Sequence, residues 1–364
     1  MADAAAAAAL RVRGAAPVFR VAVFVGLGVL FAALFILTIA AGSVAIPPAD
    51  VVAVLLGAAP AESSWATIVQ QIRLPRAITA ALAGAGLGVG GLQMQTLFRN
   101  PLADPFILGV SSGASLGVAL VVLVAGTAGT SLVDGLGVTG NIGIAGAAAA
   151  GAAAVTMVVL AVSRRVTSPA TVLIIGLMAG YATSAIVSVL LYSGLGRVER
   201  IRAYISWGFG SFGGTTWSEL RVLVVAVVAG LVVATLTTKP MNALLLGDRY
   251  AASMGVQVRR ARLLIVLGAS VLAGTITAFC GPIAFIGVAV PHMVRGLLRS
   301  SDHRLLVPGT IVLGAAIALA AGLIAQLPGT DATLPLNAVT SLVGAPVVVA
   351  ILLRLRRSST AVMS

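Results

Sequence analysis

The sequence reads Arg99-Asn100-Pro101-Leu102-Ala103-Asp104-Pro105 between two long runs of small apolar residues. Proline lacks a backbone donor and disfavours a helical residue before it, so its two occurrences here predict a turn that ends one helix and precedes another. Residues 84–95 before the turn and 108–114 after it are rich in glycine. Helices with such small side chains can pack backbone to backbone. We therefore expect two closely packed helices joined by a polar turn.

The composition is that of an integral membrane protein. Hydrophobic residues make up 59% of the 364 residues, charged residues only 9%, and the mean hydropathy is +1.11. A soluble domain carries roughly a quarter charged residues, whereas a bilayer core needs about 20 apolar residues per helix. The sequence predicts about ten membrane helices in an all-α fold. Their expected positions are residues 19–42, 77–97, 106–126, 141–162, 170–192, 219–237, 263–281, 283–298, 305–327 and 335–353.

The basic residues predict the orientation. Lys and Arg concentrate in short cytoplasmic loops, and alternation from a cytoplasmic Arg11, Arg13 and Arg20 places 17 of the 23 basic residues on that side. Both termini are then cytoplasmic. We expect an alanine-rich N-terminal tail over residues 1–18, one membrane domain over 19–354 and a cytoplasmic C-terminal tail over 355–364. The first apolar run exceeds the core of a signal peptide, about 7–15 residues, so it is expected to remain as a membrane helix.

The sequence lacks the residue patterns of several function classes. The net charge of +13 comes without a dense basic tract or an aromatic base-stacking motif, which argues against nucleic-acid binding. No metalloprotease, metal-cluster or nucleophile-elbow motif is present. The only histidines, His292 and His303, are expected at cytoplasmic helix ends, and the single cysteine, Cys280, lies in an apolar span. We predict no catalytic residue, no metal site and no cofactor in this chain.

The sequence also lacks the residues with which a transporter would use ATP or an ion gradient. The only lysine, Lys239, precedes Pro240, so the chain has no Gly-Lys-Ser/Thr phosphate loop. Secondary transporters commonly use intramembrane acids, yet here all ten acids lie in or beside loops. They are Asp3, Asp50, Glu62, Asp104, Asp134, Glu199, Glu219, Asp248, Asp302 and Asp331. An ion-coupled carrier and a membrane-bound enzyme or scaffold stay as alternatives, but an external energy source is favoured.

A docking element for such a source is expected between residues 241 and 256. This moderately polar segment lies on the cytoplasmic side in the predicted topology. Asp248 can cap a short helix there and Gly255 can end it. A short helix across the cytoplasmic face can pass a rigid-body motion from a soluble partner into the spans.

Several motifs, in the same order, resemble the FecCD-type permeases, the membrane subunits of ABC importers for iron-siderophores, haem and cobalamin. The resemblance runs from about Ile46 to Arg354. Its motifs are Arg73-Leu74-Pro75-Arg76, the glycine-rich approach to Gln93 and Gln95, Arg99 to Pro105, Leu244 to Val256, Gly281 to His292, Leu334-Pro335 and Gly344-Ala345-Pro346.

The resemblance implies the type II ABC importer fold, with ten helices per subunit, in a bacterial inner membrane. The partners it implies are a second copy of the chain or a paralogous permease, two ATPase subunits that hold ATP and Mg, and a substrate-binding protein. The lipid bilayer surrounds the permease. An iron-siderophore is the default substrate, followed by haem and cobalamin.

The resemblance also implies roles for particular residues. Arg73 and Arg76 would dock the binding protein, and Thr167 and Ser168 would lie at a cytoplasmic gate. A third docking arginine of the cobalamin member is Gln326 here, and Arg197, Arg200 or Arg202 are candidates to replace it. His292 is expected to have a structural role, and Trp65, Trp207 and Trp217 are expected at the outer interface. The ATPase coupling helix would comprise Leu246, Gly247, Asp248, Arg249, Met254 and Gly255.

Overall fold

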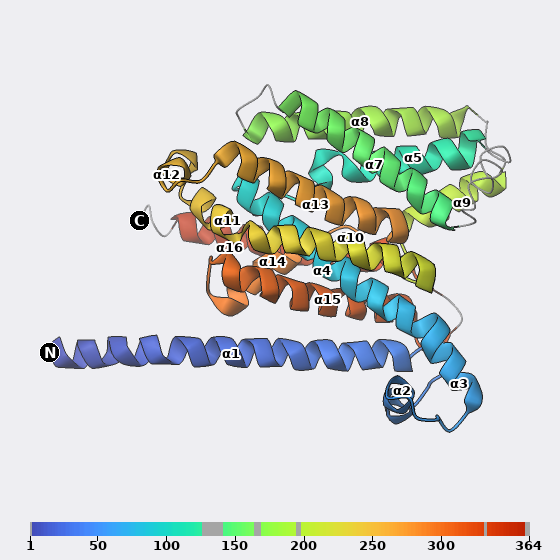
Figure 1. Cartoon of the computed structure of the whole chain (residues 1–364), viewed down its shortest axis with the longest axis horizontal. Helices are drawn as coiled ribbons and strands as arrows, with labels where there is room; N and C mark the ends of the chain where they lie inside the picture. Colours follow the sequence, from blue (N-terminus) through green and yellow to red (C-terminus); the bar gives the residue numbers. More distant parts are fainter. Residues whose placement is uncertain (1, 126–140, 164–168, 194–197, 331–332, 361–364) are drawn as a thin grey trace.

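The protein is a layered bundle of helices (Figure 1). The structure, a computed structural model, describes residues 2–125, 141–163, 169–193, 198–330 and 333–360, and none of these residues lies in a β-strand. The first half comprises α1 (Ala2–Ala40), α2 (Pro48–Leu55), α3 (Ser63–Thr67), η1 (Ile68–Arg73), α4 (Leu74–Phe98), η2 (Pro105–Leu108), α5 (Val110–Ala119), η3 (Leu120–Ala125), α7 (Asn141–Ser163) and α8 (Pro169–Tyr192). The second half comprises α9 (Val198–Gly208), α10 (Trp217–Leu236), α11 (Thr238–Leu245), α12 (Asp248–Ser253), α13 (Val258–Cys280), α14 (Ile286–Leu298), α15 (His303–Ala325) and α16 (Leu336–Thr360).

The predicted set of membrane helices is confirmed in the described chain. Seven helices are long and apolar enough to cross a membrane, and three shorter apolar helices match the remaining predicted segments. The long ones are Val18–Ala40, Ser63–Phe98, Gly143–Val162, Thr171–Tyr192, Trp217–Leu236, Val258–Cys280 and His303–Ala325, and the short ones are Val110–Leu123, Ile286–Leu298 and Leu336–Ala350.

The helix α4 is the centre of the bundle. Every residue from Ala83 to Leu97 is buried, and α4 contacts α10, α13, α14 and α15. Its glycines permit this packing, since a Cβ on Gly91 would lie 1.8 Å from the carbonyl oxygen of Gly287 in α14. In Figure 1, α5, α7 and α8 form a layer beyond α13, whereas α15 and then α1 lie on the opposite side. The glycine-rich approach to the turn is therefore the core of the fold.

The second membrane helix begins earlier than the sequence indicates. The sequence predicts a span that starts at residue 77, but a continuous helix starts at Ser63. The chain passes through the π-helical turn η1 before Arg73, and Trp217 at the start of α10 donates a 3.0 Å hydrogen bond to the carbonyl oxygen of Gln70. The exposed polar side chains of Gln70 and Gln71 interrupt the apolar run, so the sequence gives little sign of a helix here.

The helix α14 is only about half a span. The segment before it is extended, and both Gly281 (φ 73°) and Phe285 (φ 70°) have left-handed backbone conformations. Glycine is needed at position 281, because a Cβ there would lie 2.4 Å from the carbonyl oxygen of Trp207. Asn337 accepts a hydrogen bond from the Ala284 amide and fixes this segment against the start of α16. The predicted span 283–298 is thus an extended entry followed by a short helix.

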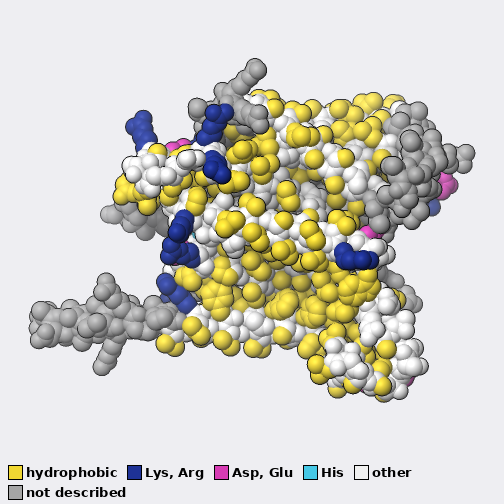
Figure 2. Space-filling model, viewed as in Figure 1, with side chains coloured by type: hydrophobic (Ala, Val, Ile, Leu, Met, Phe, Trp, Pro, Cys, Tyr) yellow, Lys and Arg dark blue, Asp and Glu magenta, His cyan; other side chains and the backbone are white. Residues whose placement is uncertain are grey.

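The two ends of the bundle differ in charge. The start of α1 and the end of α16 lie at the same end as α11 and α12, which we call the α12 end, and α2, α3 and α9 lie at the opposite, α2 end (Figure 1). Figure 2 shows the Lys and Arg side chains of this face gathered mostly at the α12 end, with a broad hydrophobic surface across the middle. Concentration of Lys and Arg at one end is the distribution that the positive-inside rule describes for membrane proteins.

Candidate functional site

The turn at residues 99–105 is fixed by its own polar groups. Arg99 ends α4 in the left-handed conformation (φ 48°, ψ 38°). The side chain of Asn100 accepts a 3.0 Å hydrogen bond from the Leu102 amide, and Asp104 accepts one of 2.9 Å from the Phe106 amide at the start of η2. Pro105 follows as the first residue of η2, where its missing N–H costs nothing. Residues 99–104 thus form a turn between α4 and η2, with Asp104 as the cap of the helical turn that leads into α5.

Asp104 is partly buried, against α14. A Cβ on Gly287 of α14 would lie 2.8 Å from its second carboxylate oxygen, so the bare glycine backbone makes room for it. Burial raises the pKa of the Asp104 carboxyl to about 6, although the hydrogen bond from Phe106 opposes this shift. The sequence places this acid in a loop but gives no sign of its burial, which depends on α14.

The predicted docking segment forms a two-helix corner at the α12 end. The helices α11 and α12 meet at Gly247, whose φ of 111° favours glycine. Leu246, Tyr250 and Met254 expose 63%, 57% and 59% of their surface, so the corner presents apolar side chains outward. Arg249 and Gly255 are also exposed. Such a mixed apolar and charged corner is suited to a cleft in a soluble partner.

The turn and this corner are joined by charge. Arg99 donates a 3.2 Å hydrogen bond to one oxygen of Asp248, and Arg262 in α13 donates to the other. Asp248 therefore holds the start of α12 against both the end of α4 and the start of α13. Two motifs that are 149 residues apart in the sequence lie at one site.

A polar cluster between α11, α4 and α15 was not predicted from the sequence. His303, with no exposed surface, has one ring nitrogen, Nδ1, 2.7 Å from the side-chain oxygen of Asn242 and the other, Nε2, 2.7 Å from the Thr96 hydroxyl. The Asn242 amide also donates to Asp302 at 2.7 Å. From the sequence, His303 is predicted only to lie at a helix end. Its partner Asn242 lies within the predicted docking segment, which is the one available signal.

A second cluster joins α4 to α14. The Gln95 side-chain amide donates to the carbonyl oxygens of Gly287 (3.3 Å) and Val288 (3.1 Å), and its oxygen accepts from Arg295. A single glutamine thus satisfies carbonyls at the start of the short helix and anchors a basic side chain near its end. Gln93, two residues earlier, is fully buried, and neither of its side-chain polar atoms has a partner.

The two predicted docking arginines have different surroundings at the α2 end. Arg73 is only 8% exposed and donates to the carbonyl oxygens of Ile39 and Ala40, both at 2.8 Å, and of Val44. These carbonyls lie at and just after the end of α1. A Cβ on Gly42 would lie 2.6 Å from the Arg73 guanidinium. Arg73 therefore stabilises the end of α1, where the sequence analysis expects an outward-facing contact.

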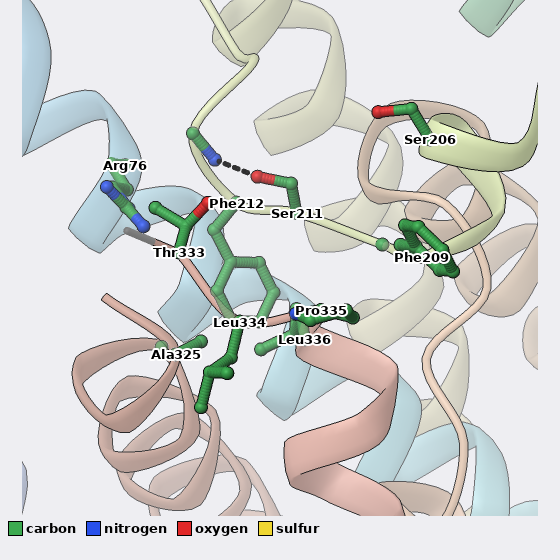
Figure 3. Close-up of a pocket in the computed structure, with 13 residues that line it drawn as sticks. Arg76, Ser206, Phe209, Ser211, Phe212, Ala325, Thr333, Leu334, Pro335 and Leu336 are labelled. Atoms are coloured by element: carbon green, nitrogen blue, oxygen red, sulfur yellow. Dashed lines mark hydrogen bonds between the residues drawn. The ribbon is translucent and has the colours of Figure 1, made fainter. Parts of the chain in front are cut away.

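Arg76 lines a cavity of about 480 Å³ at the same end. Figure 3 shows Arg76 and Thr333 on one side, Ser206 and Phe209 on the other, and Phe212 between them. The Arg76 Nε atom is buried and has no hydrogen-bond partner. The guanidinium is thus a partly unsatisfied donor beside an open cavity, a suitable site for a carboxylate.

The remaining candidates are less informative. Arg202 is exposed on α9 and Arg200 is partly buried, whereas Gln326 is a buried residue at the end of α15. His292 is partly buried within α14. Thr167, Ser168 and Arg197 lie outside the described residues. Within the described ranges, no three His, Cys, Asp or Glu side chains are grouped closely enough to hold a metal ion.

The chain is similar to known proteins over most of its length. The FecCD transport family matches residues 30–354. The vitamin B12 import system permease protein BtuC of Klebsiella pneumoniae subsp. pneumoniae is 34% identical over 331 residues, which cover 91% of this chain and 93% of that protein. The protein of the same name from Escherichia coli O9:H4 is 35% identical over 289 residues, or 79% and 84% of the two chains.

A solved structure shares the fold. It is described as a metal-chelate type ABC transporter in an inward-facing conformation, and its chain matches with a TM-score of 0.78 at 26% sequence identity. The match covers 91% of this chain and 98% of the other.

Proposed function

The chain belongs to the FecCD transport family and is the permease of an ABC importer, and from this premise we propose that it carries a large metal chelate into the cytoplasm across a bacterial inner membrane. ATP hydrolysis in separate subunits drives alternating access. The α12 end faces the cytoplasm in this proposal, which agrees with the basic side chains gathered there.

The observation that carries the proposal is the ion-paired corner at α11 and α12. Exposed Leu246, Tyr250 and Met254 form an apolar contact surface, and Asp248 connects this surface to the end of the central helix through Arg99. A soluble ATPase subunit bound there can move α4 without contact inside the membrane. Arg249 and Gly255 complete the proposed contact.

At the α2 end we assign docking of the substrate-binding protein to Arg76. Its guanidinium borders a cavity and has an unsatisfied buried Nε, whereas Arg73 is occupied by the carbonyls at and just after the end of α1. An acidic side chain of the binding protein is the natural partner, because an arginine and a carboxylate form oriented, charge-assisted contacts. Gln326 offers no charge, so Arg200 or Arg202 on α9 are the candidates for a second contact.

Cobalamin is the first substrate to test, because the two curated relatives described above carry vitamin B12 in their names. The related structure is named for a metal chelate, which keeps iron-siderophores and haem as further candidates. The proposed assembly pairs this chain with a second copy or a paralogous permease, two ATPase subunits with ATP and Mg, and one binding protein.

Reconstitution tests the proposal. The chain is purified with the subunits that accompany it, placed in liposomes and supplied in turn with cyanocobalamin, ferrichrome and haemin, each with its binding protein. We expect accumulation of one chelate that requires ATP. Accumulation driven by an ion gradient alone would instead indicate a secondary carrier, and purification without an ATPase subunit or any transport would favour a scaffold.

A further inference from the structure

The strongest unassigned feature is the buried polar chain from α11 to α4. Asn242, in the middle of α11, has its side-chain oxygen 2.9 Å from the His303 amide nitrogen and 2.7 Å from His303 Nδ1. His303 Nε2 reaches the Thr96 hydroxyl, three residues before Arg99. This chain of hydrogen bonds therefore begins beside the proposed ATPase contact and ends beside the turn after the central helix.

The donors and acceptors define the direction of these bonds. The Asn242 side-chain oxygen can only accept, so both the His303 amide and His303 Nδ1 donate to it. The Asn242 amide group donates to Asp302, which fixes which side-chain atom faces which neighbour. With Nδ1 protonated, the neutral ring offers Nε2 as an acceptor, so the Thr96 hydroxyl donates its one proton to Nε2, with the Leu92 carbonyl oxygen 2.8 Å away as the competing acceptor. No group in the chain can rotate without breaking a bond to its neighbour.

Burial makes this chain a firmer connection than the ion pair at the surface. His303 has no exposed surface and Thr96 is 2% exposed, so water cannot replace the bond between them when it breaks, whereas Asn242 is partly buried. Arg99 and Asp248, in contrast, have side chains that are 49% and 43% exposed. Pairs so exposed contribute little free energy. Displacement of α11 must consequently carry the start of α15 and the end of α4 with it.

We propose that Asn242, His303 and Thr96 are positioning residues that transmit the movement of the ATPase-facing corner to the central helix. This inference rests on the proposed function. None of the three residues contacts the substrate or ATP in this proposal. Their role is to hold α11, α15 and α4 in one register, so that hydrolysis in the partner subunit produces movement in the membrane.

The test measures the coupling ratio, which is the number of ATP molecules hydrolysed per chelate imported. The complete complex is reconstituted, and phosphate release and uptake of cyanocobalamin, or of ferrichrome if cyanocobalamin is not moved, are measured in the same vesicles. Asn242→Ala breaks the chain at α11. Thr96→Val breaks it at α4 with little change of shape. Thr238→Ala is the matched control, because its hydroxyl bonds only within its own stretch of chain, to the Thr235 carbonyl oxygen.

We expect Asn242→Ala and Thr96→Val each to raise the coupling ratio at least about threefold, with the ATPase subunit still bound. The double variant should show no greater rise than the larger single effect, because both changes interrupt one chain. Thr238→Ala should leave the ratio unchanged.

Three results would overturn the inference: an unchanged ratio in Thr96→Val, effects that multiply in the double variant, or losses of uptake and hydrolysis in equal proportion. If Asn242→Ala fails to assemble, His303→Asn replaces it, since asparagine can still donate to Asn242 but is too short for Thr96. Failure of the unmodified complex to import any chelate with ATP would reject the proposed function itself, independently of these variants.

Discussion

Gly84 in α4 and Gly314 in α15 lie backbone against backbone. A Cβ on Gly84 would lie 2.0 Å from the Gly314 carbonyl oxygen, and a Cβ on Gly314 would lie 2.4 Å from the Gly84 carbonyl oxygen. The contact is reciprocal, so neither helix can accept a larger residue without separation of the pair. This crossing sets the distance between the central helix and the helix that begins at His303.

Gly84→Ala should therefore destabilise the protein by about 2 kcal/mol or more, because backbone atoms cannot move aside as side chains can. Thermal unfolding in detergent measures the effect. Gly26→Ala and Gly28→Ala are matched controls in α1, where an added Cβ meets nothing within 4 Å. The controls should be neutral or stabilising by up to about 1 kcal/mol. Equal melting temperatures for Gly84→Ala and the controls would contradict the crossing.

Arg73→Lys should lower stability by about 2–3 kcal/mol, because an ammonium cannot reproduce the fork of donors that reaches three carbonyls. Arg73→Met should be at least as severe. The measurement is again unfolding in detergent, with Arg202→Lys on the exposed surface of α9 as the control. A fully stable Arg73→Lys would show that the contacts at the end of α1 are unimportant and would return Arg73 to the docking surface.

Arg76→Glu should weaken capture of the binding protein by at least about tenfold, since it replaces a charge-assisted contact with repulsion. The remaining affinity should depend less on salt than that of the unmodified permease. Titration of the binding protein onto the reconstituted permease across a salt series measures both. Arg221→Glu makes the same charge change at an exposed site on α10 and should have a smaller effect. Identical salt dependence in Arg76→Glu and the unmodified permease would exclude docking at this cavity.

Asp104 should make stability decrease as the pH rises from about 4 to about 6. Its pKa is raised in the folded chain, from 3.8 to about 6, so the folded state binds the proton more tightly and loses that advantage on deprotonation. Asp104→Asn keeps an acceptor for the Phe106 amide but cannot ionise. The unmodified protein should lose about 1–2 kcal/mol relative to Asp104→Asn between pH 4 and pH 7. Parallel stability curves for the two proteins would disprove the burial.

Asp302 does not confuse this measurement. The Arg304 amide, the Asn242 side chain and neighbouring positive charge lower its pKa, with burial acting in the opposite direction. A carboxyl of this kind contributes stability that is lost only as the pH falls below its ordinary value. The loss therefore occurs on the acid side of the window used for Asp104, and it is the same in both proteins compared.

Asp248→Asn should leave folding within about 1 kcal/mol of the unmodified protein, because its ion pairs are largely exposed. It removes the charge that joins α12 to Arg99 and Arg262, so we expect chelate uptake to fall while the ATPase subunits still hydrolyse ATP. Uptake and hydrolysis in the same vesicles measure this. Glu62→Gln, at an exposed site on the α2 end, is the control. Normal uptake by Asp248→Asn would reject its part in coupling.

The sequence predicted the spans and the turn well because both depend on local chemistry. Apolar length specifies a membrane helix, and two prolines with Asn100 and Asp104 specify a turn whatever surrounds it. The predicted start of the second membrane helix was wrong because Gln70 and Gln71 place exposed polar side chains in the π-helical turn. The contact of this turn with Trp217, which accompanies the early start, joins residues far apart in the sequence.

The candidate site was predicted in pieces rather than as a whole. The motifs at Arg99 and Asp248 were recognised separately, but nothing in either shows that they form an ion pair. His303 and Asn242 were not recognised as partners, since 61 residues separate them. The inward orientation of Arg73 depends on the bare backbone at Gly42, in the segment that follows α1.

The left-handed backbone of Arg99 implies a conflict between thermal stability and transport activity. A residue with a side chain is roughly 1–2 kcal/mol less stable than glycine in that conformation. Here that residue is Arg99, whose side chain joins the turn to Asp248. Directed evolution for heat resistance alone would be expected to select Arg99→Gly and discard that connection. Selection for uptake would restore arginine, so this position can reveal which of the two demands shaped the chain.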